Sequence, residues 1–122
     1  MNTIPYAELD ANIVHLVRAL NAFPGISTIG CCGGHENPSE IQRPLGEWFV
    51  TFHVAHTKGG WRSLESIAGA VTLDPWRTSL TTHTSQPGHA TGRSLFFSLQ
   101  GWEFADPERI AAYLDRLREQ VE

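Results

Sequence analysis

The sequence alternates between two hydrophobic periods, and this alternation restricts the fold more than any other feature. Segments whose apolar residues recur every three or four positions are separated by pairs of short runs rich in β-branched and aromatic residues. Helices are expected over Tyr6–Ala22, Trp61–Val71 and a closing segment from Asp106 to Val121. Strands are expected over Ile26–Cys31, Trp48–Ala55, Trp76–Thr84 and Arg93–Trp102. The expected order is therefore one helix followed by two strand–strand–helix units.

Turn and capping residues divide the chain in the same way. Phe23-Pro24-Gly25 should end the first helix, because proline cannot continue the backbone ladder. Lys58-Gly59-Gly60 is expected to break the chain before the second helix, and Ser85–Thr91 has the composition of a turn between two strands. Asp106-Pro107-Glu108 is typical of a helix start. Short links between paired strands favour an antiparallel or mixed four-stranded sheet packed with three helices, an α+β fold.

Length and composition indicate one folded domain over residues 1–122. A chain of this size buries about two thirds of its surface on folding. A hydrophobic content of 41% excludes disorder, and no apolar run approaches the roughly 18 residues that span a bilayer. The first residues lack the basic region of a leader. We therefore expect a cytoplasmic domain without a membrane partner. The two units of similar length also suggest an internal duplication.

The charge balance argues against nucleic acid as a partner. The formal net charge is −4, and no basic run occurs anywhere in the chain. Proteins that hold tRNA through its phosphates need a basic face, so binding to tRNA is disfavoured. The two cysteines, Cys31 and Cys32, are adjacent. A disulfide between neighbours would be strained and would not connect distant parts of the chain. A secreted disulfide framework is therefore excluded.

One short segment contains residues that could bind a ligand or react with one. It is Gly30-Cys31-Cys32-Gly33-Gly34-His35, at the start of a long loop over Cys32–Leu45. Its glycines let backbone N–H groups converge on a ligand. A thiol beside an imidazole can be activated as a thiolate, and the same pair can hold a metal. In the simpler alternative Cys31 points into the core, Cys32 lines a turn and the glycines only form the bend.

Three ordered patterns resemble the tRNA wybutosine-synthesis methyltransferase family. That family has a Ser-Cys-Ser-Gly-Arg segment at a strand end, and Gly30-Cys31-Cys32-Gly33-Gly34 is similar. A tryptophan followed five residues later by histidine is matched by Trp48 and His53, and an acidic-Pro-aromatic step by Asp74-Pro75-Trp76. The likeness covers roughly Ile26–Thr84. Members of the family use S-adenosylmethionine to methylate a modified guanosine in tRNA.

The resemblance implies a ligand pocket at the strand end. Its candidate proton acceptors are His35 and His53, with His53 on the sheet face opposite the core because side chains alternate along a strand. The candidate ligand-binding residues are Cys31, Cys32, Gly33, Gly34, Trp48, Asp74 and Trp76. The ligand would be S-adenosylmethionine or a nucleotide. The expectation on which this site depends is that the double-cysteine bend and His53 open onto one hollow.

Other classes of function stay open. A zinc site would combine one of the cysteines with His35 and one or two of His53, His56, His83 and His89. Adjacent cysteines lack the usual metal-ligand spacing, so no metal site is expected. A cysteine-dependent enzyme would use Cys31 or Cys32 as its nucleophile. A non-catalytic interaction module, or a homodimer formed through aromatic strands, is the remaining alternative.

Overall fold

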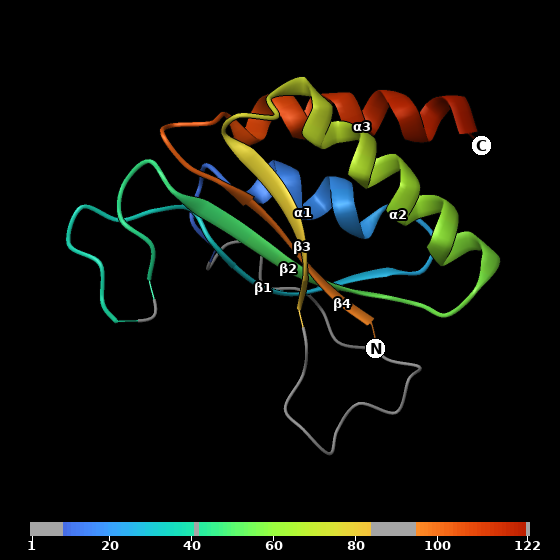
Figure 1. Cartoon of the computed structure of the whole chain (residues 1–122), viewed down its shortest axis with the longest axis horizontal. Coiled ribbons are helices and arrows are strands. Elements are labelled where there is room, and N and C mark those ends of the chain that lie inside the picture. The colour runs from blue at the N-terminus through green and yellow to red at the C-terminus, as the bar shows by residue number, and fades with distance from the viewer. Residues whose placement is uncertain (1–8, 41, 84–94, 122) are drawn as a thin grey trace, which may run out of the picture.

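A computed structural model of the chain describes residues 9–40, 42–83 and 95–121, and it has the expected α+β architecture. The helices are α1 (Val14–Asn21), α2 (Lys58–Ala70) and α3 (Pro107–Val121), with a short 3-10 helix, η2 (Val71–Leu73), after α2. The strands are β1 (Ile26–Cys32), β2 (Trp48–Val54), β3 (Thr78–His83) and β4 (Leu95–Gly101). All three helices lie on one side of the sheet (Figure 1). None of the described helices is long and apolar enough to cross a bilayer.

The four strands form one sheet in the order β1-β2-β4-β3, and every neighbouring pair is antiparallel. The first strand pair therefore meets the second through β2 and β4, with β1 and β3 at the two edges. If the first strand pair (β1, β2) and the second (β3, β4) changed places, the sheet would have the order β3-β4-β2-β1, which is the same order counted from the other edge. An internal duplication would produce such a topology, and it stays a hypothesis. Because β1 is an edge strand, segments from other parts of the chain can reach its end.

The core lies between the helices and one face of the sheet. On β2, Trp48, Val50, Phe52 and Val54 are buried against the helical layer, while Phe49, Thr51 and His53 alternate with them onto the other face. The helices contribute the second half of the core: Leu16, Val17 and Leu20 from α1, Ile67 from α2, and Ile110, Ala111 and Leu114 from α3. Thr51 on the other face is also buried, so the side chains of β2 alternate in direction more regularly than in exposure.

The first helix begins later than expected. Residues 6–8 lie outside the described part, residues 9 and 10 are not helical, and residues 11–13 form a turn before α1 starts at Val14. The turn is held by a bond from the Ile13 N–H to the Asp10 carbonyl, 3.0 Å. The side chains of Asp10 and Asn12 bond instead to the backbone of Gly33. The helix is shortened because these two polar side chains are used in a contact with another segment.

The expected break at Lys58-Gly59-Gly60 is wrong, because these residues form the first turn of α2. Thr57 caps the helix, its Oγ1 accepting a hydrogen bond from the Gly60 N–H at 3.0 Å. A side chain at Gly60 would collide with the Ala55 carbonyl, so the glycine permits a close approach rather than a chain break. At α3 the prediction is confirmed: the Asp106 carboxylate accepts from the Glu108 N–H at 3.0 Å. The expected turn at 85–91 lies outside the described residues.

Candidate functional site

Three potential ligand groups meet at the end of β1. They are the carboxylate of Asp10 from the turn before α1, the thiol of Cys32 at the end of β1, and the imidazole of His35 in the following bend. One donor atom from each lies within 4.8 Å of the other two. The Asp10 Oδ2 to His35 Nε2 distance is 3.2 Å. We call these three residues the Asp10–Cys32–His35 cluster.

Backbone hydrogen bonds fix this cluster in place. The Gly33 N–H donates to Asp10 Oδ2 at 2.8 Å, and the Asn12 side chain donates to the Gly33 carbonyl, also at 2.8 Å. The Arg43 N–H donates to the Cys32 sulfur at 3.4 Å. His35 is held by its own N–H, which donates to the Arg43 carbonyl at 2.9 Å. Every member of the cluster is therefore oriented by the backbone or by a neighbouring side chain.

The two glycines of the bend are required by space and conformation. A Cβ on Gly33 would clash with the Asn12 side chain. Gly34 has a φ of 97°, a region that only glycine enters freely, and a Cβ there would lie 2.7 Å from the Glu47 carbonyl oxygen. The expectation that the glycines shape the bend agrees with these contacts. Neither position tolerates a side chain without displacing its neighbours.

A groove of about 390 Å³ lies beside the bend. Its volume falls within the range of small-molecule sites. It is bounded by the bend, the chain before β2 and the start of α3, and is lined by Asn12, Gly33, Leu45, Gly46, Trp48, Phe104, Ala105, Asp106 and Pro107. Two of the predicted ligand-binding residues, Gly33 and Trp48, therefore line one cavity.

The wall of the groove before α3 has an unusual backbone. Glu103 and Phe104 are consecutive non-glycine residues with positive φ angles, 53° and 60°. Such residues cost free energy and cluster at binding and catalytic sites. The Phe104 N–H donates to the Gly46 carbonyl at 2.9 Å, and the Phe104 ring covers Gly46 while remaining 70% exposed. The strained turn thus holds an exposed aromatic ring over the groove.

Asp74 is linked to this turn by way of Arg77. The Asp74 carboxylate pairs with Arg77 Nη2 at 2.8 Å, and Arg77 Nη1 donates to the Glu103 carbonyl at 3.3 Å. Both residues lie before β3, at the edge of the sheet farthest from β1. Three strand spacings of about 4.8 Å separate that edge from Cys32. Asp74 is therefore placed to support the groove wall and does not join the cluster.

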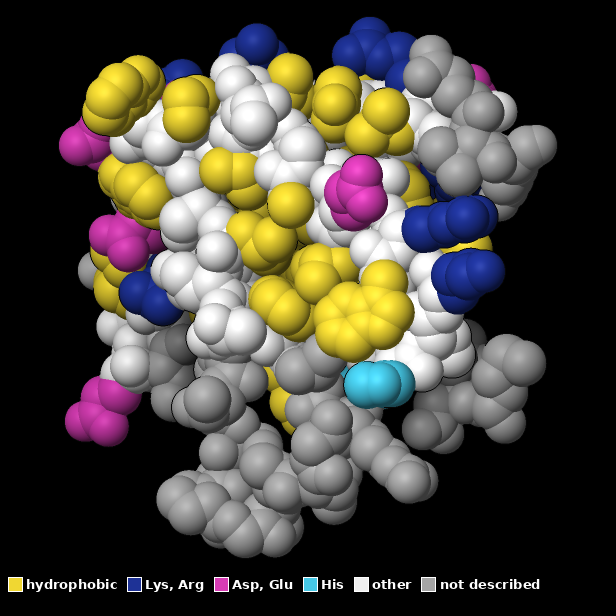
Figure 2. Space-filling view, turned by 45° about the vertical axis from the view of Figure 1, so that its right-hand side comes forward, with side chains coloured by type: hydrophobic (Ala, Val, Ile, Leu, Met, Phe, Trp, Pro, Cys, Tyr) yellow, Lys and Arg dark blue, Asp and Glu magenta, His cyan; other side chains and the backbone are white. Residues whose placement is uncertain are grey.

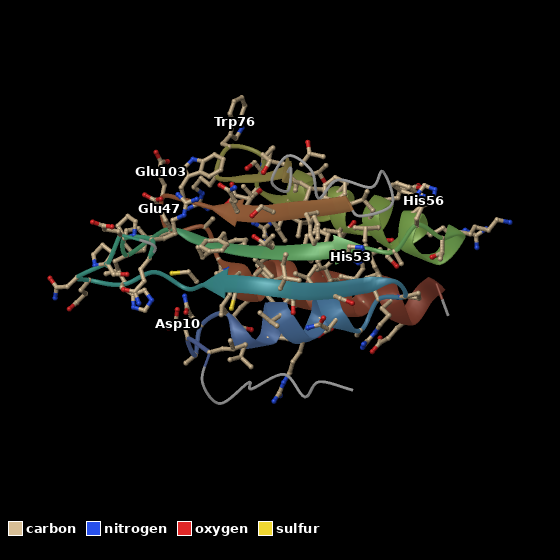
Figure 3. All side chains as sticks on the ribbon, turned by 90° about the horizontal axis from the view of Figure 1, so that it is seen from below. Asp10, Glu47, His53, His56, Trp76 and Glu103 are labelled. Carbon is tan, nitrogen blue, oxygen red and sulfur yellow. The ribbon has the colours of Figure 1, made fainter. Side chains whose placement is uncertain are left out.

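The expected proximity of His53 to the bend is wrong. In the β1–β2 pair Cys32 lies opposite Phe49, whereas His53 lies opposite Ser27 at the other end of β1. The two places are four positions apart along β2, or about 13 Å. Figure 3 shows His53 and His56 toward one end of the sheet and Asp10 toward the other. His53 does face away from the helices, as expected, and its ring contacts Phe96 at a centroid distance of 5.4 Å.

The two predicted tryptophans have different surroundings. Trp48 is buried, its indole N–H donates to the Ala105 carbonyl at 2.8 Å, and its ring packs over Gly101. It belongs to the core and forms part of the groove floor. Trp76 is 85% exposed in the turn before β3. It lies at the same end of the sheet as Glu47 and Glu103 (Figure 3), but it does not line the groove.

The neighbouring cysteines point to opposite faces of the sheet. Cys31 lies opposite Val50 and packs against the core, and Cys32 lies opposite Phe49 under the loop that contains Arg43. Burial, and then the nearby Asp10 carboxylate and Cys32, raise the pKa of the Cys31 thiol above its usual value. Cys31 is therefore kept as a neutral thiol and is poorly suited to act as a nucleophile. Both cysteines are free.

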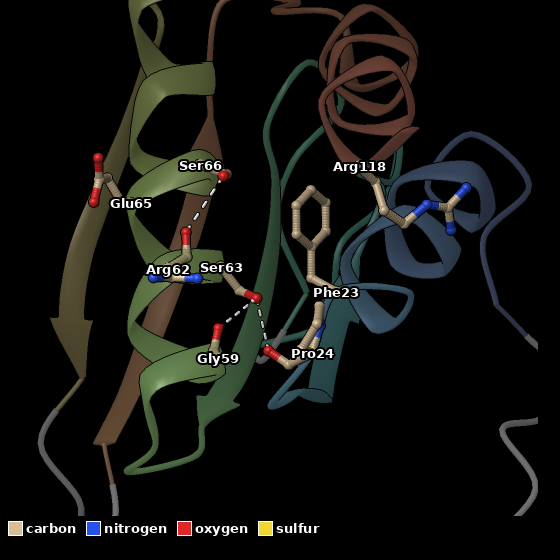
Figure 4. A pocket seen from close by; sticks show the side chains of 8 residues that line it. All are labelled: Phe23, Pro24, Gly59, Arg62, Ser63, Glu65, Ser66 and Arg118. Carbon is tan, nitrogen blue, oxygen red and sulfur yellow. Dashed lines mark hydrogen bonds between the residues drawn. The ribbon is translucent and has the colours of Figure 1, made fainter. Parts of the chain in front are cut away.

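A larger cavity of about 530 Å³ lies elsewhere, between α2, the Phe23–Pro24 turn and the last part of α3 (Figure 4). In the space-filling view, hydrophobic side chains gather in the middle of the face shown, with most of the Lys and Arg side chains at its margin (Figure 2). Ser63 Oγ at the cavity donates to the Pro24 and Gly59 carbonyls. None of the predicted site residues lines this cavity, and its charged groups are Arg62, Glu65 and Arg118.

Sequence reasoning missed Asp10, Asn12 and Phe104. Asp10 and Asn12 were absorbed into the expected first helix, although Asp and Asn are poor residues for a helix interior and favour caps and turns. That preference is the signal that could have singled them out. Phe104 follows a predicted strand and carries no motif, so only the chain path reveals its role. Comparisons of the chain with protein-family models, curated proteins and solved structures found no match.

Proposed function

We propose that the chain binds a small cationic ligand of the S-adenosylmethionine type in the groove between the bend and Phe104. The observation that carries the proposal is the groove itself, which brings Gly33 and Trp48 together with a strained, exposed aromatic turn. Backbone held in costly conformations beside a cavity is typical of a ligand clamp. The resemblance to wybutosine-type methyltransferases supplies the ligand class.

Charge favours S-adenosylmethionine over a nucleotide. Acidic side chains surround this end of the sheet: Asp106 lines the groove, Glu103 adjoins it, and Asp10 and Glu47 lie nearby (Figure 3). Two arginines of neighbouring segments are already paired with acids, Arg43 with Glu47 at 3.8 Å and Arg77 with Asp74. A sulfonium cation is attracted by such a rim and by the face of an aromatic ring, whereas a polyphosphate is repelled.

The proposed reaction is methyl transfer, in which the protein positions donor and acceptor. The methyl group would pass from the sulfonium to a nucleophilic atom of the acceptor, releasing S-adenosylhomocysteine. His35 is the candidate that would take the acceptor's proton, since it lies beside Gly33 and is oriented by Asp10. His53 is too far along the sheet to share this role.

Isothermal titration of the full chain with S-adenosylmethionine, S-adenosylhomocysteine and ATP tests the proposal. We expect both S-adenosyl compounds to bind, the charged sulfonium more tightly, and ATP to bind at least tenfold more weakly. Phe104→Ala should weaken S-adenosylmethionine binding about tenfold, a loss of about 1.4 kcal/mol. Ile29→Ala is the matched control, because Ile29 is another exposed large apolar residue but lies on β1 away from the groove.

Three results would overturn the proposal. Equal weakening by Phe104→Ala and Ile29→Ala would place the ligand outside the groove. Absence of binding at millimolar S-adenosylmethionine would leave the interaction module as the better description, with the larger cavity beside α2 as the candidate surface. Tighter binding of ATP would instead assign the groove to nucleotides.

A further inference from the structure

The geometry points to a zinc-type metal site formed by Asp10, Cys32 and His35, with a fourth position open to solvent. Adjacent cysteines lack the usual metal-ligand spacing, so the sequence predicts no such site, and Asp10 comes from a separate segment before α1. Among the described residues this is the one place where three His, Cys, Asp or Glu side chains offer donor atoms within 4.8 Å of one another. The inference concerns the cluster alone and does not depend on what the neighbouring groove binds, but an ion bound through His35 Nε2 would take the place of the proton-acceptor role proposed above for His35.

The distances suit a tetrahedral ion after small shifts. Nitrogen and oxygen ligands at roughly 2.1 Å from a tetrahedral zinc lie about 3.4 Å from each other. Asp10 Oδ2 and His35 Nε2 are 3.2 Å apart, a spacing that a bridging ion could occupy in place of a shared proton. The Cys32 sulfur lies within 4.8 Å of both atoms and must move by about 1 Å at most to complete a triangular face.

The chemistry of the three donors selects the ion. Thiolate and imidazole together favour zinc over magnesium or calcium, which prefer oxygen ligands. One carboxylate and one thiolate balance the two charges of a divalent ion, and the imidazole binds as a neutral group. Three protein ligands with an open fourth position are the pattern of catalytic rather than structural zinc. Binding would displace the thiol proton of Cys32 to solvent.

Groups around the cluster already orient the donors as outer partners of a metal site do. The Gly33 N–H donates to the Asp10 carboxylate, and the Arg43 N–H donates to the Cys32 sulfur. Such bonds fix ligand orientation and usually change metal affinity by tenfold or more when lost. Access is also suitable: Cys32 is only 5% exposed, but the side chains of His35 and Asp10 are 30% and 34% exposed. An ion could therefore enter from the His35 side.

Titration of the reduced, chelator-treated full chain with Co²⁺ tests the inference. Cobalt reports its own ligands, since a bound thiolate gives a charge-transfer band and four-coordination gives intense visible bands. We expect one equivalent of Co²⁺ to produce both signals, and Zn²⁺ to displace it. Cys32→Ser should abolish the charge-transfer band. His35→Gln and Asp10→Asn should weaken Co²⁺ binding roughly tenfold or more.

Cys31→Ser is the matched control, because Cys31 is the adjacent thiol and faces the core. It should leave the cobalt spectrum unchanged. His35→Gln alters a partly exposed side chain and keeps the test decisive if Cys32→Ser fails to fold. The inference is overturned by no saturable signal at micromolar Co²⁺, by loss of the band in Cys31→Ser, or by unaltered binding in His35→Gln. Phe104→Ala should not change Co²⁺ binding, so failure of the groove proposal is distinguishable from failure of this one.

Discussion

The two ends of the sheet are built differently. At the end where β1 starts and β2 finishes, the chain closes by direct packing: a Cβ on Gly25 would lie 2.8 Å from the Gly60 Cα, and Gly60 abuts the Ala55 backbone. At the other end the chain leaves large apolar groups in solvent, with Trp76 and Phe104 the most exposed among the described residues. That end also holds the consecutive positive φ angles and the Asp10–Cys32–His35 cluster.

The comparison distinguishes tightly packed backbone, which stabilises the fold, from strained backbone, which lowers its stability. Close packing of the backbone at one end gains free energy, and the larger cavity adjoins that end at the Phe23–Pro24 turn and Gly59. Strained backbone and exposed rings at the other end lower stability, and natural proteins retain such features where they bind or react. We therefore expect substitutions at the packed end to change stability, and substitutions at the strained end to change binding with little loss of stability, or a gain.

The largest expected effect is at the packed end. Gly60→Ala places a methyl group against the Ala55 carbonyl, and backbone cannot move aside as a flexible side chain can. We expect a loss of about 3 kcal/mol in the free energy of unfolding, or roughly 10 °C in Tm. Urea unfolding followed by circular dichroism measures it.

Gly59→Ala is the matched control, one residue earlier in the same helical turn. Its Cβ would meet Pro24 at 3.4 Å, an ordinary contact, and alanine favours the helix. We expect a gain of about 0.5 kcal/mol. Equal losses at Gly59 and Gly60 would mean that the close approach at Gly60 does not explain its glycine, and the contrast between the two ends would lose its clearest support.

The fold was predictable where local pattern and tertiary packing agree. The alternation along β2 and the Asp-Pro start of α3 both describe the structure correctly. The glycine pair before Trp61 was misinterpreted because local propensity treats glycine as a breaker, whereas the contact with Ala55 requires glycine inside a helix. The start of α1 was misplaced for a similar reason, since Asp10 and Asn12 are engaged with Gly33.

The site was predictable only in part. Cys32, Gly33, Gly34 and His35 were found because they are contiguous and chemically distinctive. Asp10 was missed because its contact depends on how the chain returns to the edge of the sheet. His53 could have been excluded from the sequence: in an antiparallel pair the end of one strand meets the start of the next, so a residue late in the second strand lies at the far end.

A smaller effect with opposite sign is expected at the strained end. Glu103→Gly puts glycine where φ is 53°, and we expect a gain of about 1 kcal/mol in the free energy of unfolding because the left-handed conformation no longer costs free energy. The same replacement at Glu65, exposed in the middle of α2, should cost about 1 kcal/mol. Urea unfolding of both variants compares them. Destabilisation by Glu103→Gly would show that this turn is not strained.

The smallest expected effect is a pH dependence of stability that arises in the helical layer, between α1 and α3. His15 on α1 lies between two carboxylates of α3: its Nδ1 is 2.6 Å from Glu108 and its Nε2 is 2.7 Å from Asp115. Hydrogen bonds to Asp115 and then to Glu108 raise the pKa of His15 above the ordinary value of 6.5. The folded state therefore binds this proton more tightly than the unfolded state, and the stabilisation is fully present below pH 6.5.

As pH rises through the elevated pKa of folded His15, this stabilisation is lost. The side chain is 38% exposed, so solvent screens both pairs and we expect a change of only about 0.5–1 kcal/mol between pH 6 and pH 8.5. The difference between wild type and His15→Gln in urea unfolding isolates the effect from other titrating groups, and 1 M salt should reduce it. If the stability difference between wild type and His15→Gln grew as the pH rose, its sign would contradict a proton that the folded state binds more tightly than the unfolded state. Co²⁺ binding should be unchanged in His15→Gln, because neither carboxylate that holds His15 belongs to the Asp10–Cys32–His35 cluster.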